Sequence, residues 1–98
     1  MPFQLEFTPQ GSSDLDALIN TPSKRAVLKA VRKCLGYLEN NPKHTSLKTH
    51  KYSSLIGPNG EEVFEAYAQN NTPGVYRVFW CYGPKKGKIT IIAITPHP

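Results

Sequence analysis

Three β-rich runs in the second half of the chain constrain the fold more than any other feature. They are EVFEAYAQ (Glu62–Gln69), VYRVFWCY (Val75–Tyr82) and KITIIAIT (Lys88–Thr95), each dominated by β-branched and aromatic residues. The segments NNTPG and GPKKGK that separate them are short and rich in turn-forming residues, which suits antiparallel hairpins. The sequence therefore predicts a three-stranded antiparallel meander.

The beginning of the chain predicts one strand and a short helix. FQLEF (Phe3–Phe7) alternates apolar and polar residues with the period of a half-buried strand. Pro9 and Gly11 then break the pattern. The segment SDLDALIN is expected to form a short helix with Ser13 or Asp14 near its cap.

A longer helix is expected from Thr21-Pro22 to about Asn40, where NNP ends it. A hydroxyl cap followed by proline at the first helical position is a typical helix start, and the residue before a proline leaves the helical region. At 100° per residue the apolar side chains gather on one face, which comprises Val27, Val31, Cys34 or Leu35, and Leu38. The opposite face is basic, with Arg25, Lys29, Arg32 and Lys33.

The order strand, helix, helix, meander indicates an α+β fold. We expect an antiparallel sheet made of the N-terminal strand and the meander, with both helices packed on one face. At 98 residues, the chain is expected to form a single domain over residues 1–98.

The alternation of side chains along the strands predicts which residues face the helices. The core set is Phe64, Ala66, Ala68, Val78, Trp80, Ile92 and Ile94. The opposite side of the sheet would then carry Glu65, Tyr67, Arg77 and Phe79. If these faces coincide, an arginine, a glutamate and aromatic rings stand together on the side of the sheet that the helices leave uncovered.

Charge and hydropathy narrow the possible partners. Twelve lysines and arginines against seven acidic residues give a net charge of +5 and a pI near 9.4. Such an excess attracts polyanions: nucleic acid, an acidic partner protein or an anionic membrane surface. No apolar run approaches the roughly 18–20 residues that span a bilayer, and MPFQLEF lacks the features of a signal peptide. We therefore expect a cytoplasmic protein that does not contact a membrane.

Cys34 and Cys81 are the only cysteines. One falls on the apolar stripe of the longer helix and the other lies within a β-rich run, so both are interpreted as small core residues in a reducing compartment. The three histidines and two cysteines show no metal-ligand spacing. We expect neither a metal nor an organic cofactor.

The segment HTSLKTHKY (His44–Tyr52) concentrates two histidines and two lysines without an acidic residue. It is expected to be a loop. Exposed lysines and histidines need no special role, so the loop is either a solvated turn or the rim of a phosphate-binding site.

Taken in order, these segments resemble the RelE/ParE superfamily, the toxin half of bacterial type II toxin–antitoxin pairs. The resemblance covers nearly the whole chain and is carried by LENNP, HTSLKTHK, VFEAYAQN, YRVFW and ITIIAITPHP. It implies a small curved antiparallel sheet with two helices packed on it. It also implies a cognate antitoxin protein as partner.

RelE-like members of this superfamily resemble ribosome-dependent ribonucleases that cut mRNA in the decoding site. The resemblance therefore implies that mRNA and the ribosome are partners. In this reaction a 2′-hydroxyl attacks its own phosphodiester, so the enzyme must transfer protons and stabilise a doubly charged phosphorane. Arginine and lysine can provide that stabilisation without a metal.

The resemblance also implies roles for particular residues. Arg77 matches an arginine that faces the substrate phosphate, and His97 matches a terminal histidine that acts as general acid or base. Lys48 and His50 lie where relatives place a phosphate-binding lysine or a general base. The expected backbone contacts are Lys51, His44, Lys43, Arg32 and Lys29. Many relatives follow the terminal histidine with a tyrosine, whereas Pro98 follows here. The tyrosine role is therefore either vacant or taken by Tyr67 or Tyr82, with Glu65 as a supporting residue.

Four alternatives remain open at this level. The chain could be a ParE-like toxin that inhibits DNA gyrase without nuclease activity, or an inactive RNA-binding relative. Arg77 could form a cross-strand pair with Glu65, which is compatible with a catalytic role. His97 could lie in a frayed terminus.

Overall fold

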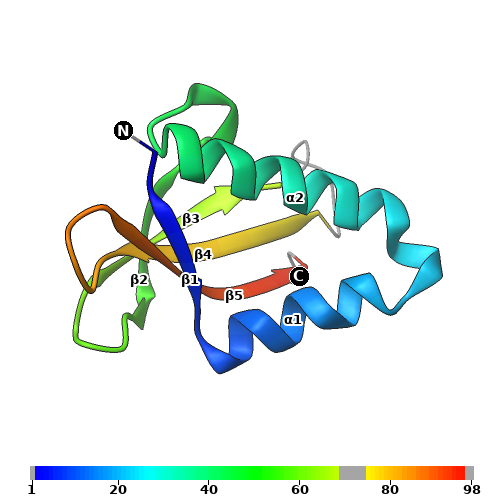
Figure 1. The fold of residues 1–98 in the computed structure, drawn as a ribbon, viewed down its shortest axis with the longest axis horizontal. Coiled ribbons are helices and arrows are strands. Elements are labelled where there is room, and N and C mark those ends of the chain that lie inside the picture. Colours follow the sequence, from blue (N-terminus) through cyan, green and yellow to red (C-terminus); the bar gives the residue numbers. More distant parts are fainter. Residues whose placement is uncertain (1, 69–74, 97–98) are drawn as a thin grey trace.

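The computed structural model describes residues 2–68 and 75–96. The helices are α1 (Pro9–Ile19) and α2 (Arg25–Asn40), and two short 3-10 turns occupy Pro22–Lys24 and Thr45–Leu47. The strands are β1 (Gln4–Phe7), β2 (His50–Ile56), β3 (Glu62–Tyr67), β4 (Tyr76–Tyr82) and β5 (Lys88–Pro96). They form one sheet in the order β1-β5-β4-β3-β2 (Figure 1).

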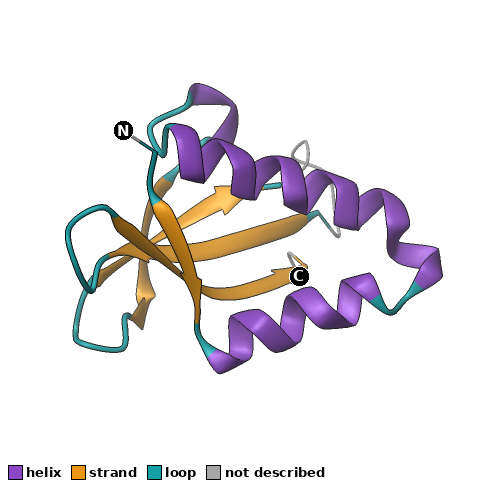
Figure 2. Ribbon diagram, in the orientation of Figure 1, coloured by secondary structure: helices purple, strands orange, loops and turns teal. Residues whose placement is uncertain are grey.

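The α+β class and the packing of both helices on one face of the sheet are confirmed. The helices form a hairpin (Figure 2), with α1 packed on β5 and α2 on β4. Their buried side chains are Leu18 from α1 and Val31, Cys34, Leu35 and Leu38 from α2. From the sheet they meet Ala66, Val78, Trp80, Ile89, Ile91 and Ile94.

The predicted meander is also confirmed. β3, β4 and β5 are successive antiparallel neighbours, and GPKKGK joins β4 to β5 as a hairpin. The NNTPG turn lies outside the described residues.

The prediction of a wholly antiparallel sheet is wrong, because β1 pairs with β5 in parallel. The register runs from Gln4 opposite Lys88 to Phe7 opposite Ile91. Both helices and the other strands separate β1 from β5 along the chain. This long connection lets the two strands run in the same direction.

The loop expected over His44–Tyr52 is partly a strand. Its second half opens β2, which pairs with β3 through His50–Glu65 and Lys51–Phe64 and again at its far end. Most residues of β2 are exposed and the pairing is irregular between those ends. An edge strand of this kind has no apolar alternation that a sequence pattern could reveal.

Both helix starts differ from the sequence prediction. α1 begins at Pro9 rather than near Ser13, because the Thr8 side chain caps it by accepting a 3.0 Å hydrogen bond from the Gly11 amide. Pro22 begins a 3-10 turn, and α2 follows from Arg25. The Thr21 hydroxyl donates to the Ala17 carbonyl instead of capping α2.

The core assignment is correct except in β5. Phe64, Ala66, Ala68, Val78, Trp80 and Ile94 belong to the core or pack against it. Ile92 does not, because the register shifts between the pairs Phe79–Ala93 and Trp80–Ile91, which leaves Ile92 as an extra residue. Ile91 takes its place in the core.

Gly11 marks a close approach between α1 and β5. A Cβ atom there would lie 2.5 Å from the Ile91 carbonyl oxygen, whereas one on Gly36 in α2 would meet nothing within 4 Å. We expect Gly11→Ala to lower the free energy of unfolding by about 1–3 kcal/mol, because backbone must move. The matched variant Gly36→Ala should raise it by roughly 0.5–1 kcal/mol. Urea denaturation of both measures this, and an unchanged midpoint in Gly11→Ala would contradict the packing.

Both cysteines are buried and free, as the sequence interpretation expects. Burial raises the pKa of Cys34 from 9.0 to about 12. Burial and the nearby Glu61 carboxylate raise that of Cys81 to about 11.

Because only thiolate reacts with disulfide reagents, we expect native labelling at pH 8 to be at least about 100-fold slower than in unfolded protein. The rate should rise as the pH approaches 11. Absorbance with Ellman's reagent, in the presence and absence of urea, measures it. Fast native labelling at pH 8 would show that the thiols are accessible.

Candidate functional site

Glu65 is the centre of a charged cluster on the sheet face opposite the helices. Its carboxylate accepts a 2.6 Å hydrogen bond from Arg77 Nη1 through Oε2, and its Oε1 contacts His50 Nε2. The three side chains come from the neighbouring strands β2, β3 and β4. They meet because the register places His50 opposite Glu65, and Arg77 opposite Tyr67, two residues further along β3.

The exposed fraction of the three side chains increases from Glu65 to Arg77 to His50. The Glu65 side chain is 5% exposed, that of Arg77 11% and that of His50 52%. The cross-strand pair of Arg77 and Glu65, one of the sequence alternatives, is therefore present and almost buried. His50 provides the accessible end of the cluster.

Both ring nitrogens of His50 face oxygen acceptors. Nε2 meets the Glu65 carboxylate, and Nδ1 lies 3.0 Å from the Lys48 carbonyl oxygen. A neutral imidazole can donate from only one nitrogen, whereas imidazolium donates from both. The two oxygen neighbours therefore fix the orientation of the ring, and the nitrogen that carries a proton donates it to one of them.

Two aromatic rings hold the Arg77 guanidinium. Its carbon lies 4.8 Å from the Phe79 ring centroid and 5.9 Å from that of Tyr52. These rings also contact each other, with centroids 4.7 Å apart. Packing against rings and the carboxylate fixes the plane of the guanidinium.

Tyr52 was not among the predicted site residues, and this face of the sheet was expected to be uncovered. Glu65 and Phe79 are in fact buried, since the Tyr52 ring packs on this side of the sheet. Tyr52 stands two residues after His50, so it shares a face with His50 once β2 is known to be a strand. That spacing was the available signal.

Tyr67 and Tyr82 lie on different sides of the sheet. The Tyr67 ring meets the His50 ring edge-on at 5.7 Å. Tyr82 instead packs against Trp80 and Phe64 on the helix side. Of the two candidate tyrosines, the structure brings only Tyr67 to the His50 cluster.

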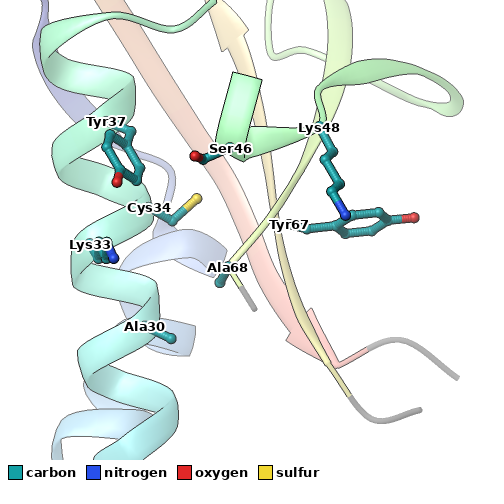
Figure 3. Close-up of a pocket in the computed structure, with 8 residues that line it drawn as sticks. All are labelled: Ala30, Lys33, Cys34, Tyr37, Ser46, Lys48, Tyr67 and Ala68. Carbon is teal, nitrogen blue, oxygen red and sulfur yellow. The ribbon is translucent and has the colours of Figure 1, made fainter. Parts of the chain in front are cut away.

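Lys48 ends the 3-10 turn before β2 in a left-handed conformation, with φ of 48°. Its side chain enters a cavity of about 350 Å³ between α2, this turn and the end of β3. Figure 3 shows it directed toward Tyr67, with Lys33, Tyr37 and Ser46 on the other side. Lys48 thus adds a cation beside the cluster without joining its ion pairs.

The remaining predicted contacts are dispersed. Lys51 faces away from His50 and pairs with Glu62 at 3.5 Å on the surface. His44 is held locally, because its ring stacks on Tyr37 and its Nδ1 accepts from the Ser46 amide. Lys43, Arg32 and Lys29 are exposed, the last two on α2. His97 lies outside the described residues.

Within residues 2–68 and 75–96, no group of three or more histidine, cysteine or acidic side chains could hold a metal ion. The same residues contain no helix long and apolar enough to cross a membrane.

The buried carboxylate predicts a large and specific stability effect. Replacing Glu65 with Ala leaves the nearly buried Arg77 without its partner. The free energy of unfolding should therefore fall by about 3–5 kcal/mol. In Glu65→Ala/Arg77→Met, no uncompensated charge remains and much of that stability should return. Urea denaturation of the two single variants and the double variant gives the coupling energy. Additive losses would show that the pair does not interact.

No family model and no curated protein sequence matches the chain. Among solved structures, an archaeal RelE–RelB complex from Pyrococcus horikoshii aligns at 21% identity and a TM-score of 0.65, covering 98% of this chain and 96% of that one. A YoeB/ParE toxin from Agrobacterium tumefaciens aligns at 12% identity and 0.69, covering 97% and 99%.

The toxin–antitoxin complex RelBE2 from Mycobacterium tuberculosis aligns at 19% identity and 0.60, covering 99% of this chain and 100% of that one. The likeness spans essentially the whole of each chain, from β1 to β5. The chain therefore has the fold of the RelE and YoeB/ParE proteins.

Proposed function

We propose that this protein is the toxin of a toxin–antitoxin pair and an endoribonuclease that cleaves mRNA on the ribosome. The observation that carries the proposal is the pairing of an accessible imidazole and a fixed guanidinium on one carboxylate. The fold, shared with RelE and YoeB/ParE proteins, and the net charge of +5 support it.

Arg77 is proposed to stabilise the phosphorane. Its Nη1 is engaged by Glu65, and a guanidinium carries five N–H donors, so others can serve a phosphate oxygen. The flanking rings hold it in one orientation, which reduces the reorganisation needed in the transition state. Lys48 would add a second positive charge from the adjoining cavity.

His50 is proposed as the general acid. Its imidazolium would give the Nδ1 proton, which faces the Lys48 carbonyl oxygen until the substrate displaces that contact, to the 5′-oxygen as the phosphorus–oxygen bond breaks. Glu65 would stabilise the charged ring through Nε2 until then. The 2′-hydroxyl must lose its proton to a base, for which the resemblance suggests His97. Tyr67, beside the imidazole, is a candidate for positioning it or contacting a base.

The basic surface suits two kinds of partner. The exposed face of α2, with Lys29 and Arg32, would contact ribosomal RNA phosphates, and this contribution would weaken steeply with salt. The cognate antitoxin is proposed to be a protein with an acidic segment complementary to the same charge. Two of the similar structures are complexes of this kind, RelE–RelB and RelBE2.

The proposal is tested by adding purified protein to a reconstituted translation reaction and mapping mRNA ends by primer extension. We expect ribosome-dependent cuts. In Arg77→Ala the cleavage rate should fall about 10²–10³-fold, and in His50→Ala about 10²–10⁴-fold, because each removes transition-state stabilisation. His97→Ala tests the proposed base in the same assay. Lys86→Ala changes an exposed residue between β4 and β5, and this variant should cleave mRNA at the wild-type rate.

Circular dichroism establishes that each variant is folded at the assay temperature. Intact mRNA at high protein concentration would overturn the nuclease. DNA gyrase inhibition by the same preparation would instead favour a ParE-like toxin. RNA binding without cleavage would favour an inactive relative.

A further inference from the structure

The side chain of His44 closes the 3-10 turn that precedes β2. Its Nδ1 accepts a 3.1 Å hydrogen bond from the Ser46 amide, and its backbone carbonyl accepts one of 3.1 Å from the Leu47 amide. The Lys48 amide donates in turn to the Thr45 carbonyl at 3.1 Å. The last two bonds join backbone groups, whereas the first depends on the protonation state of an imidazole.

The hydrogen bond from Ser46 defines that protonation state. A backbone amide can only donate, so the nitrogen that it meets must have a free lone pair. Nδ1 of His44 is therefore unprotonated, and the neutral ring carries its proton on Nε2. His50 differs, because both of its ring nitrogens face oxygen and either can hold a proton. The closed turn thus requires a neutral histidine at position 44.

Helix α2 brings an aromatic ring and a cation close to His44. The imidazole stacks on the Tyr37 ring, with centroids 4.1 Å apart and planes at 21°. Lys33 Nζ lies 5.9 Å from the centroid of the same Tyr37 ring. The exposed Glu39 stands two residues beyond Tyr37, about 200° round the helix at 100° per residue, so it belongs to another face.

The remaining titratable neighbours of His44 are two lysines and a phenol. They line, together with His44, a cavity of about 540 Å³ between this segment and the sheet, and they are Lys43, Lys48 and Tyr82. No acidic side chain of the described residues lines this cavity. A positive charge on His44 would therefore meet like charges without a carboxylate that offsets them.

The turn determines the conformation of Lys48. This residue ends the turn with φ of 48°, a left-handed conformation that costs free energy in a residue with a side chain. The hydrogen bond from its amide to Thr45 holds it there. Since the Lys48 carbonyl faces His50 Nδ1, a change in the turn reaches the charged cluster through the backbone.

We propose that protonation of His44 opens the turn Thr45–Leu47 and releases the backbone of Lys48. A proton on Nδ1 would face the Ser46 N–H, so two donors would meet and the hydrogen bond would be lost. Histidine is the side chain that changes charge between about pH 5 and 8. The closed turn needs the unprotonated ring, so it is closed at pH 8 and opens as the pH falls to 5.

The consequence for catalysis rests on the proposed function, whereas the opening of the turn does not. In the open turn the Lys48 carbonyl no longer orients His50, and the Lys48 ammonium leaves its place beside Tyr67 (Figure 3). Acidification would thus disorganise the site from a residue that takes no part in the reaction.

Nitrogen-15 NMR of the imidazole rings tests the starting state. At pH 8 His44 should be the Nε2–H tautomer, with Nδ1 unprotonated. A proton on Nδ1 at pH 8 would overturn the proposal, because the Ser46 amide could not then donate to it.

Amide exchange with water, measured by NMR, follows the turn itself. The protection of the Ser46 and Lys48 amides, each relative to its intrinsic exchange rate at the same pH, should fall about fivefold from pH 8 to pH 5, as for a typical lost capping bond. The amide of Val78, in the middle of the buried strand β4, should keep its protection because only the turn opens. Unchanged protection of the turn would contradict the proposal.

Two variants separate the hydrogen bond from the stacking. His44→Asn retains an acceptor that does not titrate, so the turn should be protected equally at both pH values. His44→Phe retains a ring on Tyr37 but has no acceptor, so protection should be low at both. His50→Ala keeps His44 and should respond to pH as the wild-type protein does.

The outcomes do not depend on whether the protein cleaves mRNA, because each is measured on the protein alone. A pH response that persists in His44→Asn would assign it to another group and overturn the proposal. High protection in His44→Phe would do the same, since stacking rather than the hydrogen bond would then hold the turn.

Discussion

The buried carboxylate of Glu65 is the interaction on which the other charged groups of the sheet depend. A carboxylate so far from solvent is costly unless cations and hydrogen bonds compensate it, and Arg77 and His50 do so from the two neighbouring strands. The same contacts fix both the guanidinium and the imidazole. One acidic side chain thus allows an arginine to lie almost buried between Tyr52 and Phe79.

The sequence pattern was sufficient where one face of a strand is apolar. The alternation in β3 and β4 assigned Phe64, Ala66, Val78 and Trp80 to the helix side, and the same parity placed Glu65 and Arg77 together opposite them. The pairing of Glu65 with Arg77 could therefore be foreseen from two strands alone. Its near-complete burial could not, because that depends on β2.

The features that could not be predicted are those without a local signal. β2 is an exposed edge strand, so its residues show no apolar period, and the place of His50 in the cluster was hidden by its assignment to a loop. The extra residue Ile92 is set by the register between β4 and β5, which no single strand reveals. Thr8-Pro9 carries the same hydroxyl-and-proline signal for a helix start as Thr21-Pro22. The start of α1 could therefore have been predicted from the sequence.

The left-handed backbone at Lys48 lets this residue contact both the His50 ring and a cavity beside α2. A lysine with φ of 48° is an uncommon conformation, held here by the end of the 3-10 turn. Its carbonyl oxygen is the acceptor that faces His50 Nδ1, while its side chain lines the cavity beside α2. One residue therefore orients the imidazole through its backbone and carries a positive charge to the cavity through its side chain.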